Sequence, residues 1–306
     1  MRRASWGLLL ACLLPLGAHA DEFDQGLQTL WEVLWHQSGT PTRIVRWETD
    51  MRVNFTGVNV AAHRAHMMEA LNTVASESHV PIRDVTGTVD ERSANVVVQI
   101  VPDYALEDNQ PCVTYLDFKV ETKIDKATVQ LRDRDEWRCA YHEAMHVMGV
   151  RGHPGGATVL SYFPTKVDGL LPLDRVMLHA WYSPRMQGGM TPFEALPVLD
   201  DELIATLPAS QKPAAVKTRD AFFAETVREM NAYASGTGDA PSIVRRSGKS
   251  TPDGIRYGRG EMGYFLGIAY LEGATVRRNE AEAMKWFERA ATMGNRGAQA
   301  KLGAFR

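Results

Sequence analysis

Between residues 46 and 55, polar and apolar residues alternate, the clearest pattern in the first third of the chain. A period of two residues predicts a strand with one buried face. Residues 61–77 then show the spacing of a helix, and 95–101 are rich in β-branched residues. Residues 113–131 hold two strand-like segments around residues 125–126. The order strand, helix, three strands and a second helix predicts an α+β domain with helices packed on a sheet.

Periodicity also predicts helices outside this region. Residues 22–36 are weakly amphipathic, and residues 216–233 have one apolar side. Asp174 is placed to cap a helix that runs to Tyr182. Residues 235–258 are rich in Gly, Ser, Pro and charge, which indicates a linker or a mobile loop.

The N-terminus has the pattern of a secretory signal peptide. Arginines at 2–3 precede an apolar run at 8–16 and an A-x-A sequence at 18–20. The apolar run is too short for a membrane span. We therefore expect a mature chain that begins at Asp21 and is periplasmic or secreted. Residues 9–12 also resemble a lipoprotein processing box, so a lipid anchor is the alternative.

Composition and charge narrow the class of protein. The net charge of the chain is -3, and losing the two N-terminal arginines makes it -5. Basic residues are dispersed, so we expect no nucleic-acid partner. No later stretch approaches the roughly 20 apolar residues of a spanning helix, so we expect no membrane span. The length favours more than one domain.

The cysteines support export. Cys12 belongs to the expected signal peptide, which leaves Cys112 and Cys139 as an even pair. In an oxidising compartment such a pair predicts a disulfide, with two buried thiols as the alternative. The bridge would tie the start of a strand to the helix around residue 140.

The clearest candidate chemistry lies in the H-E-x-x-H sequence of residues 142–146. His142 and His146 are four residues apart, so they share one face of a helix, with Glu143 beside them. Neutral imidazole is a natural zinc ligand, and a catalytic zinc keeps three protein ligands and one open position. A solvated polar helix face would show the same spacing. The motif predicts a Zn²⁺ site next to a general base.

A third ligand is expected just beyond this helix. Gly149 permits the left-handed turn that ends a helix, and the chain then returns His153 within a few residues. We expect His153, and not Gly152 or His179, to close the site. His179 sits among apolar residues and is interpreted as a packed or half-exposed side chain. If His153 does not bind, His179 and Asp168 are the alternatives.

Two further histidines are three residues apart on the helix predicted for 61–77. His63 and His66 could share a metal, but no carboxylate-rich or cysteine partner is adjacent in sequence. We interpret them as residues of a surface helix.

A longer run resembles the metzincin metallopeptidases, whose pattern is H-E-x-x-H-x-x-G-x-x-H followed by a Met-turn: HEAMHVMGVRGHPGGATVLSYF. Gly152 occupies the family's ligand position and His153 follows one residue late. Leu160 stands at the Met position, where it nearly conserves volume. Tyr162 keeps a position from which some family members approach the metal. The resemblance covers roughly residues 41–200 and implies a mixed sheet with a zinc-site helix.

A second run within this region resembles the closing helix of a family of secreted bacterial proteins of unknown function, interpreted as metzincin-like peptidases: GLLPLDRVMLHAWYSPRMQGGM.

The C-terminal residues 259–306 resemble a Sel1-type repeat, a two-helix relative of the tetratricopeptide family. Leu266-Gly267 recurs as Leu302-Gly303 about 36 residues later. The second helix would lie in the run AMKWFERAA. An ordinary helical hairpin predicts nearly the same structure. A single repeat leaves one face uncovered, so it must pack on another part of the chain or on a partner protein.

These motifs divide the chain into four expected parts. They are a signal peptide (1–20), a metzincin-like metallopeptidase domain (21–205), a helix and linker (206–258) and a Sel1-like repeat (259–306).

The predicted function is that of an exported zinc-dependent metallopeptidase acting on a peptide or protein substrate. His142, His146 and His153 would hold Zn²⁺, and Glu143 would take a proton from water and pass it to the leaving amine. Tyr162 would donate a hydrogen bond to the oxyanion, a role that the resemblance alone implies. The alternative is a catalytically degenerate periplasmic binding or scaffold protein that recruits protein partners through its repeat.

Overall fold

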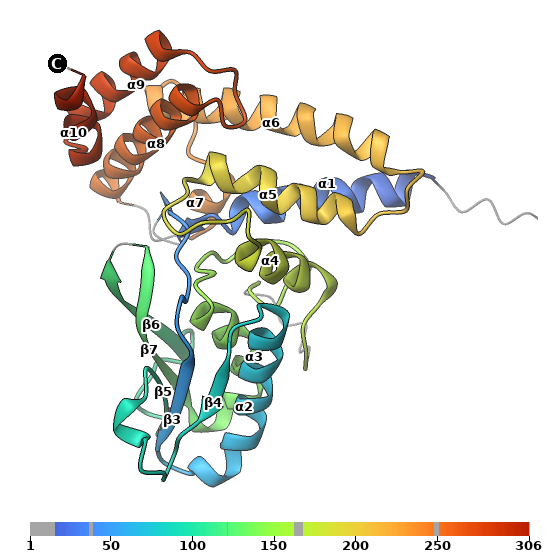
Figure 1. The fold of residues 1–306 in the computed structure, drawn as a ribbon, viewed down its shortest axis with the longest axis vertical. Coiled ribbons are helices and arrows are strands. Elements are labelled where there is room, and N and C mark those ends of the chain that lie inside the picture. Colours follow the sequence, from blue (N-terminus) through green and yellow to red (C-terminus); the bar gives the residue numbers. More distant parts are fainter. Residues whose placement is uncertain (1–15, 37–38, 121, 162–167, 248–250, 306) are drawn as a thin grey trace, which may run out of the picture.

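A computed structural model describes residues 16–36, 39–120, 122–161, 168–247 and 251–305. In these residues a sheet with helices on one face lies below a layer of longer helices (Figure 1). Most of the expected signal peptide falls outside the described residues, and α1 (Leu16–Glu32) begins before the expected mature start at Asp21. Among the described helices, each is too short or too polar to span a membrane.

The main sheet is mixed and has the strand order β4-β3-β5-β7-β6. Its strands are β3 (Met51–Gly57), β4 (Ile82–Asp84), β5 (Val96–Val101), β6 (Cys112–Val120) and β7 (Lys123–Arg132). All neighbours are parallel except β6, which runs antiparallel to β7 at one edge. A small ribbon pairs β1 (Trp35–His36) with β2 (Thr40–Pro41). A mixed sheet with separate helices agrees with the predicted α+β class, while a metzincin fold stays a prediction.

The strand expected from residue 46 begins later, at Met51. Arg46 instead lies beside the start of β7: its backbone N–H donates to Thr122 O (3.4 Å), and its carbonyl accepts from Ile124 N (3.1 Å). Trp47 is buried and donates its indole N–H to Val147 O at 2.8 Å. The alternating pattern therefore covers two segments with different neighbours. Arg46 pairs with the start of β7, and the residues from Met51 onward form β3.

The hairpin between β6 and β7 also differs from the prediction. Its turn falls before Lys123 and not at Asp125-Lys126, which belong to β7. Ile124 and Ala127 are buried while the two residues between them are exposed. The pairing of β6 with β7 shifts register at Asp117, so a bulge breaks the alternation that would have marked this strand.

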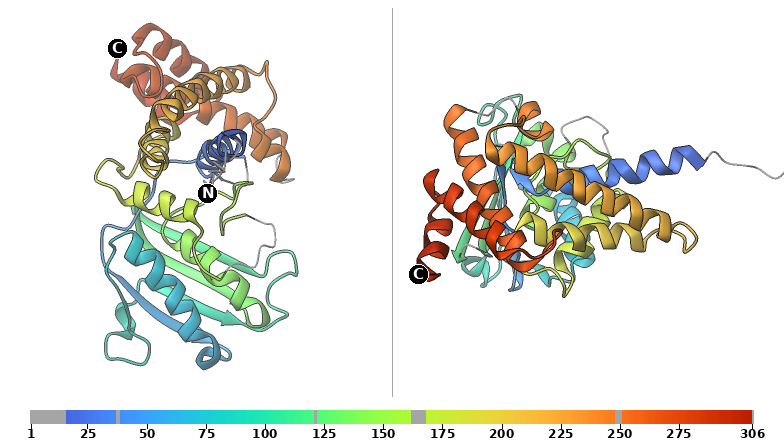
Figure 2. Two further views of the ribbon diagram at one scale, coloured as in Figure 1. Left: turned by 90° about the vertical axis from the view of Figure 1, so that its right-hand side faces the viewer. Right: turned by 90° about the horizontal axis from the view of Figure 1, so that it is seen from above.

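The helices occupy two regions of the structure. They are α1 (Leu16–Glu32), α2 (Val60–Glu77), α3 (Glu136–Val147), α4 (Pro172–Tyr182), α5 (Pro192–Ala205), α6 (Lys212–Ser235), α7 (Ser242–Ser247), α8 (Pro252–Glu272), α9 (Glu280–Thr292) and α10 (Arg296–Ala304). Short 3₁₀ helices cover Glu91–Ser93 and Asp133–Asp135. Helices α2 and α3 lie side by side on one face of the sheet (Figure 2). Helix α1 and helices α5 to α10 lie beyond one end of the sheet (Figure 1).

Part of the linker expected at 235–258 is helical. Helix α8 begins at Pro252, and Thr251 caps it by accepting from Gly254 N at 3.0 Å. A Cβ at Gly258 would lie 2.9 Å from the Tyr233 hydroxyl oxygen and 3.0 Å from Gly39 O. The glycine here permits close packing inside a helix, whereas composition alone indicated a loop.

Helices α8 and α9 form a tight hairpin. A Cβ at Gly267 would meet the Phe287 ring at 2.4 Å, so the small residue allows the two helices to cross closely. One cluster of buried apolar residues continues from the sheet through α5 and α6 to this hairpin. The C-terminal hairpin therefore packs on the rest of the chain. The expected domain boundaries stay a prediction.

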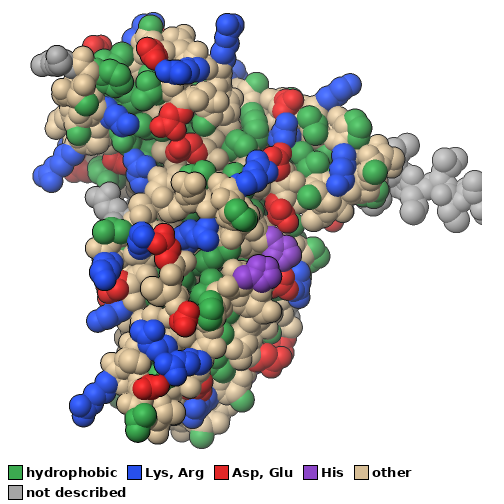
Figure 3. All heavy atoms as spheres, viewed as in Figure 1, with side chains coloured by type: hydrophobic (Ala, Val, Ile, Leu, Met, Phe, Trp, Pro, Cys, Tyr) green, Lys and Arg blue, Asp and Glu red, His purple; other side chains and the backbone are tan. Residues whose placement is uncertain are grey.

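Charged side chains of both signs are interspersed on the face shown in Figure 3. This distribution follows the near balance of 34 basic and 37 acidic residues in the sequence.

Candidate metal centre

Helix α3 presents His142, Glu143 and His146 on a face that is buried. Glu143 is 2% exposed and His146 is 8% exposed. Trp137, an apolar residue of the same helix, is 48% exposed. The polar spacing therefore does not mark a solvated helix face, which was the simpler interpretation of the motif.

A glycine turn ends α3 and orients one of the histidines. Gly149 has φ +92°, and a Cβ there would lie 2.3 Å from Val45 O. Its N–H donates to His146 O (2.9 Å), and Val150 N donates to Met145 O (3.4 Å), the pattern of a Schellman motif. The same turn exposes Val150 O to His146 Nδ1 at 2.6 Å.

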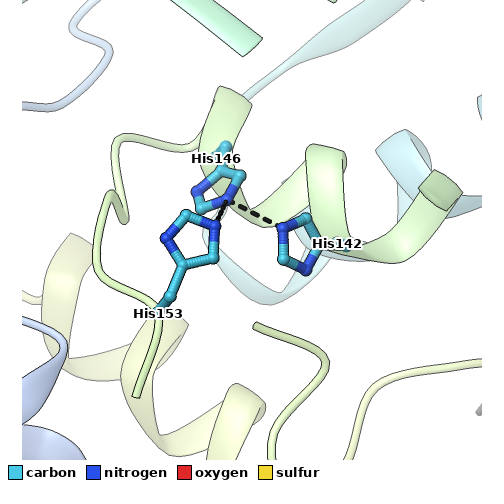
Figure 4. A group of neighbouring side chains, drawn as sticks. All are labelled: His142, His146 and His153. Carbon is cyan, nitrogen blue, oxygen red and sulfur yellow. Dashed lines mark hydrogen bonds between the residues drawn. The ribbon is translucent and has the colours of Figure 1, made fainter. Parts of the chain in front are cut away.

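Three imidazole rings converge at this point, two from α3 and one from the loop that follows (Figure 4). Nε2 of His146 lies 3.1 Å from Nε2 of His142 and 3.1 Å from Nε2 of His153. Within the described residues, these three form the cluster with ligand atoms all within 4.8 Å of one another.

The hydrogen bond made by Nδ1 of each α3 histidine determines the tautomer of that ring. His142 Nδ1 lies 2.8 Å from Val159 O, as His146 Nδ1 does at 2.6 Å from Val150 O. A carbonyl oxygen can only accept, so each Nδ1 carries the proton and each Nε2 of the neutral ring carries a lone pair. The two lone pairs face each other at 3.1 Å. They repel unless a cation or a proton lies between them.

The rings are held neutral. Burial lowers the pKa of His146 to about 3, and the neighbouring His142 adds to this shift. Burial also lowers the pKa of His142, against the opposing effect of its hydrogen bond to Val159 O. Both shifts favour the neutral imidazole, which is the form that can bind a metal cation.

The donor set fits zinc. Zinc–imidazole bonds of about 2.0–2.1 Å in a tetrahedron place neighbouring nitrogens about 3.3 Å apart. The two 3.1 Å separations lie close to that value. Nδ1–H groups donating to backbone carbonyls are the outer contacts that zinc-binding histidines commonly make.

Glu143 lies beside the three rings. Its Oε1 is 4.0 Å from His142 Nε2, and its Oε2 accepts from the Thr114 hydroxyl at 2.5 Å. Burial raises the pKa of Glu143 to about 7, and the Thr114 hydrogen bond opposes that rise. Thr114 belongs to the edge strand β6, so the sheet orients the carboxylate while α3 supplies it.

The segment beneath the site is held by Asp174 at the start of α4. Its carboxylate accepts from the Thr158 hydroxyl, from Val159 N (3.2 Å) and from Leu171 N (2.9 Å). The helix begins at Pro172, so Asp174 lies in its first turn and is not the N-cap residue that the sequence predicted; its side chain instead accepts from the backbone N–H of the N-cap residue Leu171. The same side chain also fixes Val159, the acceptor for His142. Leu160 is fully buried.

Of the other expected candidates, Tyr162 lies outside the described residues. His179 is 45% exposed on its side chain and lies 2.7 Å from Glu77 Oε2. Asp168 lies 2.9 Å from His66 Nε2. Neither belongs to the converging cluster.

His63 and His66 have carboxylate partners that the sequence did not place near them. His63 Nε2 lies 2.6 Å from Asp133 Oδ1, and His66 Nδ1 lies 3.0 Å from Glu136 Oε1. The partners come from the start of α3, which folding brings against α2. Among the described residues, the possible ligand atoms of His63, His66 and their carboxylate partners do not all lie close to one another, as those of the three-histidine cluster do.

Sequence reasoning missed four residues around the site: Thr114, Asp174 in its contact with the 158–159 segment, Glu32 and His36. Glu32 accepts from Gly155 N at 2.8 Å. His36 is close enough to lower the pKa of His146 further. No local pattern marks these residues, because their contacts join segments far apart in sequence.

Comparison with known proteins identifies the C-terminal part only. No curated protein and no solved structure matches the chain. The resemblance to metzincins therefore stays a prediction from the sequence. Residues 264–295 match the Sel1 repeat, and they span the second half of α8 and all of α9. The chain thus carries a Sel1 repeat near its C-terminus, within the region where the sequence predicted one.

Proposed function

We propose that the protein is an exported zinc-dependent metallopeptidase. The observation that carries the proposal is the convergence of three imidazole Nε2 atoms, two of which direct lone pairs at each other, next to a buried carboxylate. A structural role for these rings would not require lone pairs to face each other. His142, His146 and His153 would hold the metal.

Zinc in this position would supply Lewis acidity, which activates water near neutral pH and polarises a carbonyl oxygen. The residues of the chain supply the remaining functions. Glu143 Oε1 faces the cluster while Thr114 holds Oε2, so one oxygen stays oriented to accept a proton from water and pass it to a leaving amine. A proton-accepting group with a pKa near 7 suits this role at neutral pH. The resemblance gives Tyr162 the role of a hydrogen-bond donor to the oxyanion.

The sheet edge favours a peptide as substrate. In the described part of the chain, β6 pairs with β7 along one side only, and its Thr114 side chain contacts Glu143. An extended peptide can add to such an edge through its backbone. A peptide on the open side of β6 would run past Glu143.

The Sel1 repeat suggests an interaction with another protein. This observation favours the second candidate function, a catalytically degenerate scaffold that binds a partner. The two functions make different predictions for the metal site and for hydrolysis.

The test measures bound metal and peptide hydrolysis in the same preparations. Metal is counted by plasma mass spectrometry after dialysis, and hydrolysis is followed with a library of quenched fluorescent peptides. We expect one zinc per wild-type chain and chelator-sensitive cleavage. His146→Ala and His153→Ala should lose most of the zinc, and Glu143→Ala should keep the zinc and lose only hydrolysis.

His179→Ala is the matched control, because it removes a histidine that lies outside the cluster. It should keep both zinc and hydrolysis. Equal zinc in wild type and His153→Ala would reject the assignment of His153 as the third ligand. Stoichiometric zinc with no cleavage of any peptide would favour the scaffold.

A further inference from the structure

A buried carboxylate from a distant helix lies against the loop that carries His153. Glu32 is at the end of α1 and is 2% exposed. Its Oε2 accepts from Gly155 N at 2.8 Å. Its Oε1 accepts from the Ser242 hydroxyl at 3.1 Å and from Gln28 Nε2 at 3.0 Å. One oxygen of this buried carboxylate therefore accepts a hydrogen bond from the loop that carries His153, and the other accepts one from α7.

The loop needs such a support. Residues 151–154 form neither helix nor strand, so the loop has no regular backbone ladder to hold His153. Helix α1 and the residue after it touch the loop on both sides of this histidine. A Cβ at Gly152 would lie 2.4 Å from Val33 O, and one at Gly156 would lie 2.0 Å from the Thr29 hydroxyl oxygen.

We propose that Glu32 is a positioning residue for the third imidazole of the metal centre. Its hydrogen bond fixes Gly155, two residues beyond His153, and so holds His153 Nε2 at 3.1 Å from His146 Nε2. This inference rests on the proposed metal function. The helix α3 determines the positions of His142 and His146. Glu32 therefore acts on His153, the one expected ligand that lies outside the helix.

The same carboxylate connects the centre to the C-terminal helices. Ser242 begins α7, and Val244 of that helix packs against Gly39, where a Cβ would lie 2.8 Å from Val244 Cγ1. Loss of the Ser242 hydroxyl leaves the bond from Gly155 N to Glu32 in place. Ser242→Ala should therefore weaken metal binding less than Glu32→Ala does.

Zinc affinity tests the inference without any measurement of hydrolysis. The zinc dissociation constant is measured by competition with a chromophoric chelator for wild type, Glu32→Ala, Glu32→Gln and Ser242→Ala. Loss of a hydrogen bond made directly to a metal-binding histidine typically costs about 10- to 100-fold in metal affinity. Glu32 acts through Gly155 and not on His153 itself, so we expect Glu32→Ala to lose affinity by about the lower end of that range. Glu32→Gln keeps an oxygen that can accept from Gly155 N, so its loss should be smaller. The visible spectrum of the Co²⁺-loaded protein should change in Glu32→Ala.

A double-mutant cycle with His153→Ala separates positioning from general stability. If Glu32 acts through His153, Glu32→Ala should not weaken zinc binding further once His153 is gone. Asp84→Asn is the matched control, since Asp84 accepts from Arg64 Nε (2.6 Å) and Thr86 N (2.9 Å) away from the cluster. It should lower the melting temperature and leave the zinc dissociation constant unchanged.

The outcomes distinguish this inference from the proposed function. A wild-type protein that binds neither zinc nor Co²⁺ overturns both. A wild type that binds zinc, together with a Glu32→Ala variant of equal affinity and spectrum, overturns the role of Glu32 and leaves the metal centre standing. An equal loss in the presence and absence of His153 also overturns it. If Glu32→Ala does not fold, Glu32→Asp decides: its shorter side chain cannot reach both Gly155 N and the Ser242 hydroxyl, so unchanged zinc affinity in that variant rejects the inference.

Discussion

The backbone of Val33 lies so close to Gly152 that a Cβ on residue 152 would be 2.4 Å from Val33 O and 2.6 Å from Val33 Cα. Gly152 is the residue that occupies the ligand position of the metzincin pattern. Only a residue without a side chain can pass the backbone of Val33 at this point of the loop. The loop packs against Val33, and Nε2 of His153 lies 3.1 Å from Nε2 of His146.

Gly152→Ala should therefore disturb both stability and metal binding. The added methyl group meets backbone, which cannot move aside as a side chain could, so we expect a loss of about 1–3 kcal/mol in the free energy of unfolding. The loop must shift, so zinc affinity should fall as well. Urea unfolding and chelator competition measure the two effects.

Gly303→Ala is the control for this substitution. Gly303 lies in α10 with no atom within 4 Å of the added Cβ, so the change should stabilise the helix by less than about 1 kcal/mol. Unchanged zinc affinity in Gly152→Ala would contradict the account of the loop.

The local part of the site could be predicted because helix geometry alone determines it. His142 and His146 are four residues apart, and Gly149 marks the end of the helix. The proximity of His153 followed from its short distance along the chain. The supporting contacts could not be predicted in this way, because Glu32 is 123 residues from Gly155 in sequence. Thr114 likewise lies on β6, and only the folding of the chain brings this strand next to α3.

The fold was predictable where a single period continued through a segment. The sheet region kept its order, but the short strand β4 was missed because three residues carry no period. The bulge at Asp117 displaced the expected turn between β6 and β7. The glycine-rich start of α8 indicated a loop by composition, although Gly258 serves close packing against Tyr233. Composition cannot separate these two uses of glycine.

The predicted cysteine pair is at bonding distance in the structure. Cys112 and Cys139 connect the start of β6 to α3 across a separation of 27 residues. A loop of this length should contribute about 3.5 kcal/mol in the chain-entropy model, so reduction should lower the free energy of unfolding by about that amount. Urea unfolding with and without reductant measures the difference.

Mass spectrometry checks the bond itself. Native protein treated with an alkylating reagent in the absence of reductant should carry no label at Cys112 or Cys139. Label on both thiols would show that the pair is not bridged. The Cys112→Ser, Cys139→Ser double variant is the control, and reductant should not change its stability.

Asp200 should make the protein less stable as pH rises. Its side chain on α5 is fully buried, and neither carboxylate oxygen has a hydrogen-bond partner among the described residues. Burial raises the pKa of Asp200 well above its ordinary value, Arg219 opposes the rise, and Asp201 adds to it. The unfolded chain therefore releases this proton at a lower pH than the folded chain.

The sign of the effect follows from this difference. Below the unfolded pKa of about 4, both states are protonated and the group makes no pH-dependent contribution to stability. Above it, stability falls by about 1.4 kcal/mol per pH unit until the folded pKa is reached. Asp200→Asn should therefore raise the melting temperature near neutral pH and have little effect near pH 4.

Asp201→Asn is the control for Asp200. Asp201 is half-buried and pairs with Arg185 at 2.7 Å and with Arg219 at 2.5 Å, so its loss removes two ion pairs and should not stabilise the protein as Asp200→Asn does. Scanning calorimetry across pH compares the variants. A stability gain of Asp200→Asn that does not grow with pH would show that the carboxyl is ionised in the folded protein.

The Sel1 hairpin should not fold by itself. A single two-helix repeat leaves one apolar face uncovered, and in this chain that face is covered by other segments. The Arg43 guanidinium lies 5.4 Å from the Tyr264 ring centroid and 5.2 Å from that of Phe265. From α6, Ser235 accepts from Arg289 Nη1 at 2.8 Å.

A fragment of residues 251–306 would keep the Thr251 cap of α8 but lose these contacts. We expect it to show little helix by circular dichroism and no cooperative thermal transition, because isolated helices of this length are marginal in water. A fragment of residues 206–306 restores α6 and should gain helix content beyond that of α6 itself. A cooperative melt of the shorter fragment alone would show that the repeat covers its own apolar face, and that its contacts with α6 and Arg43 are not needed for folding.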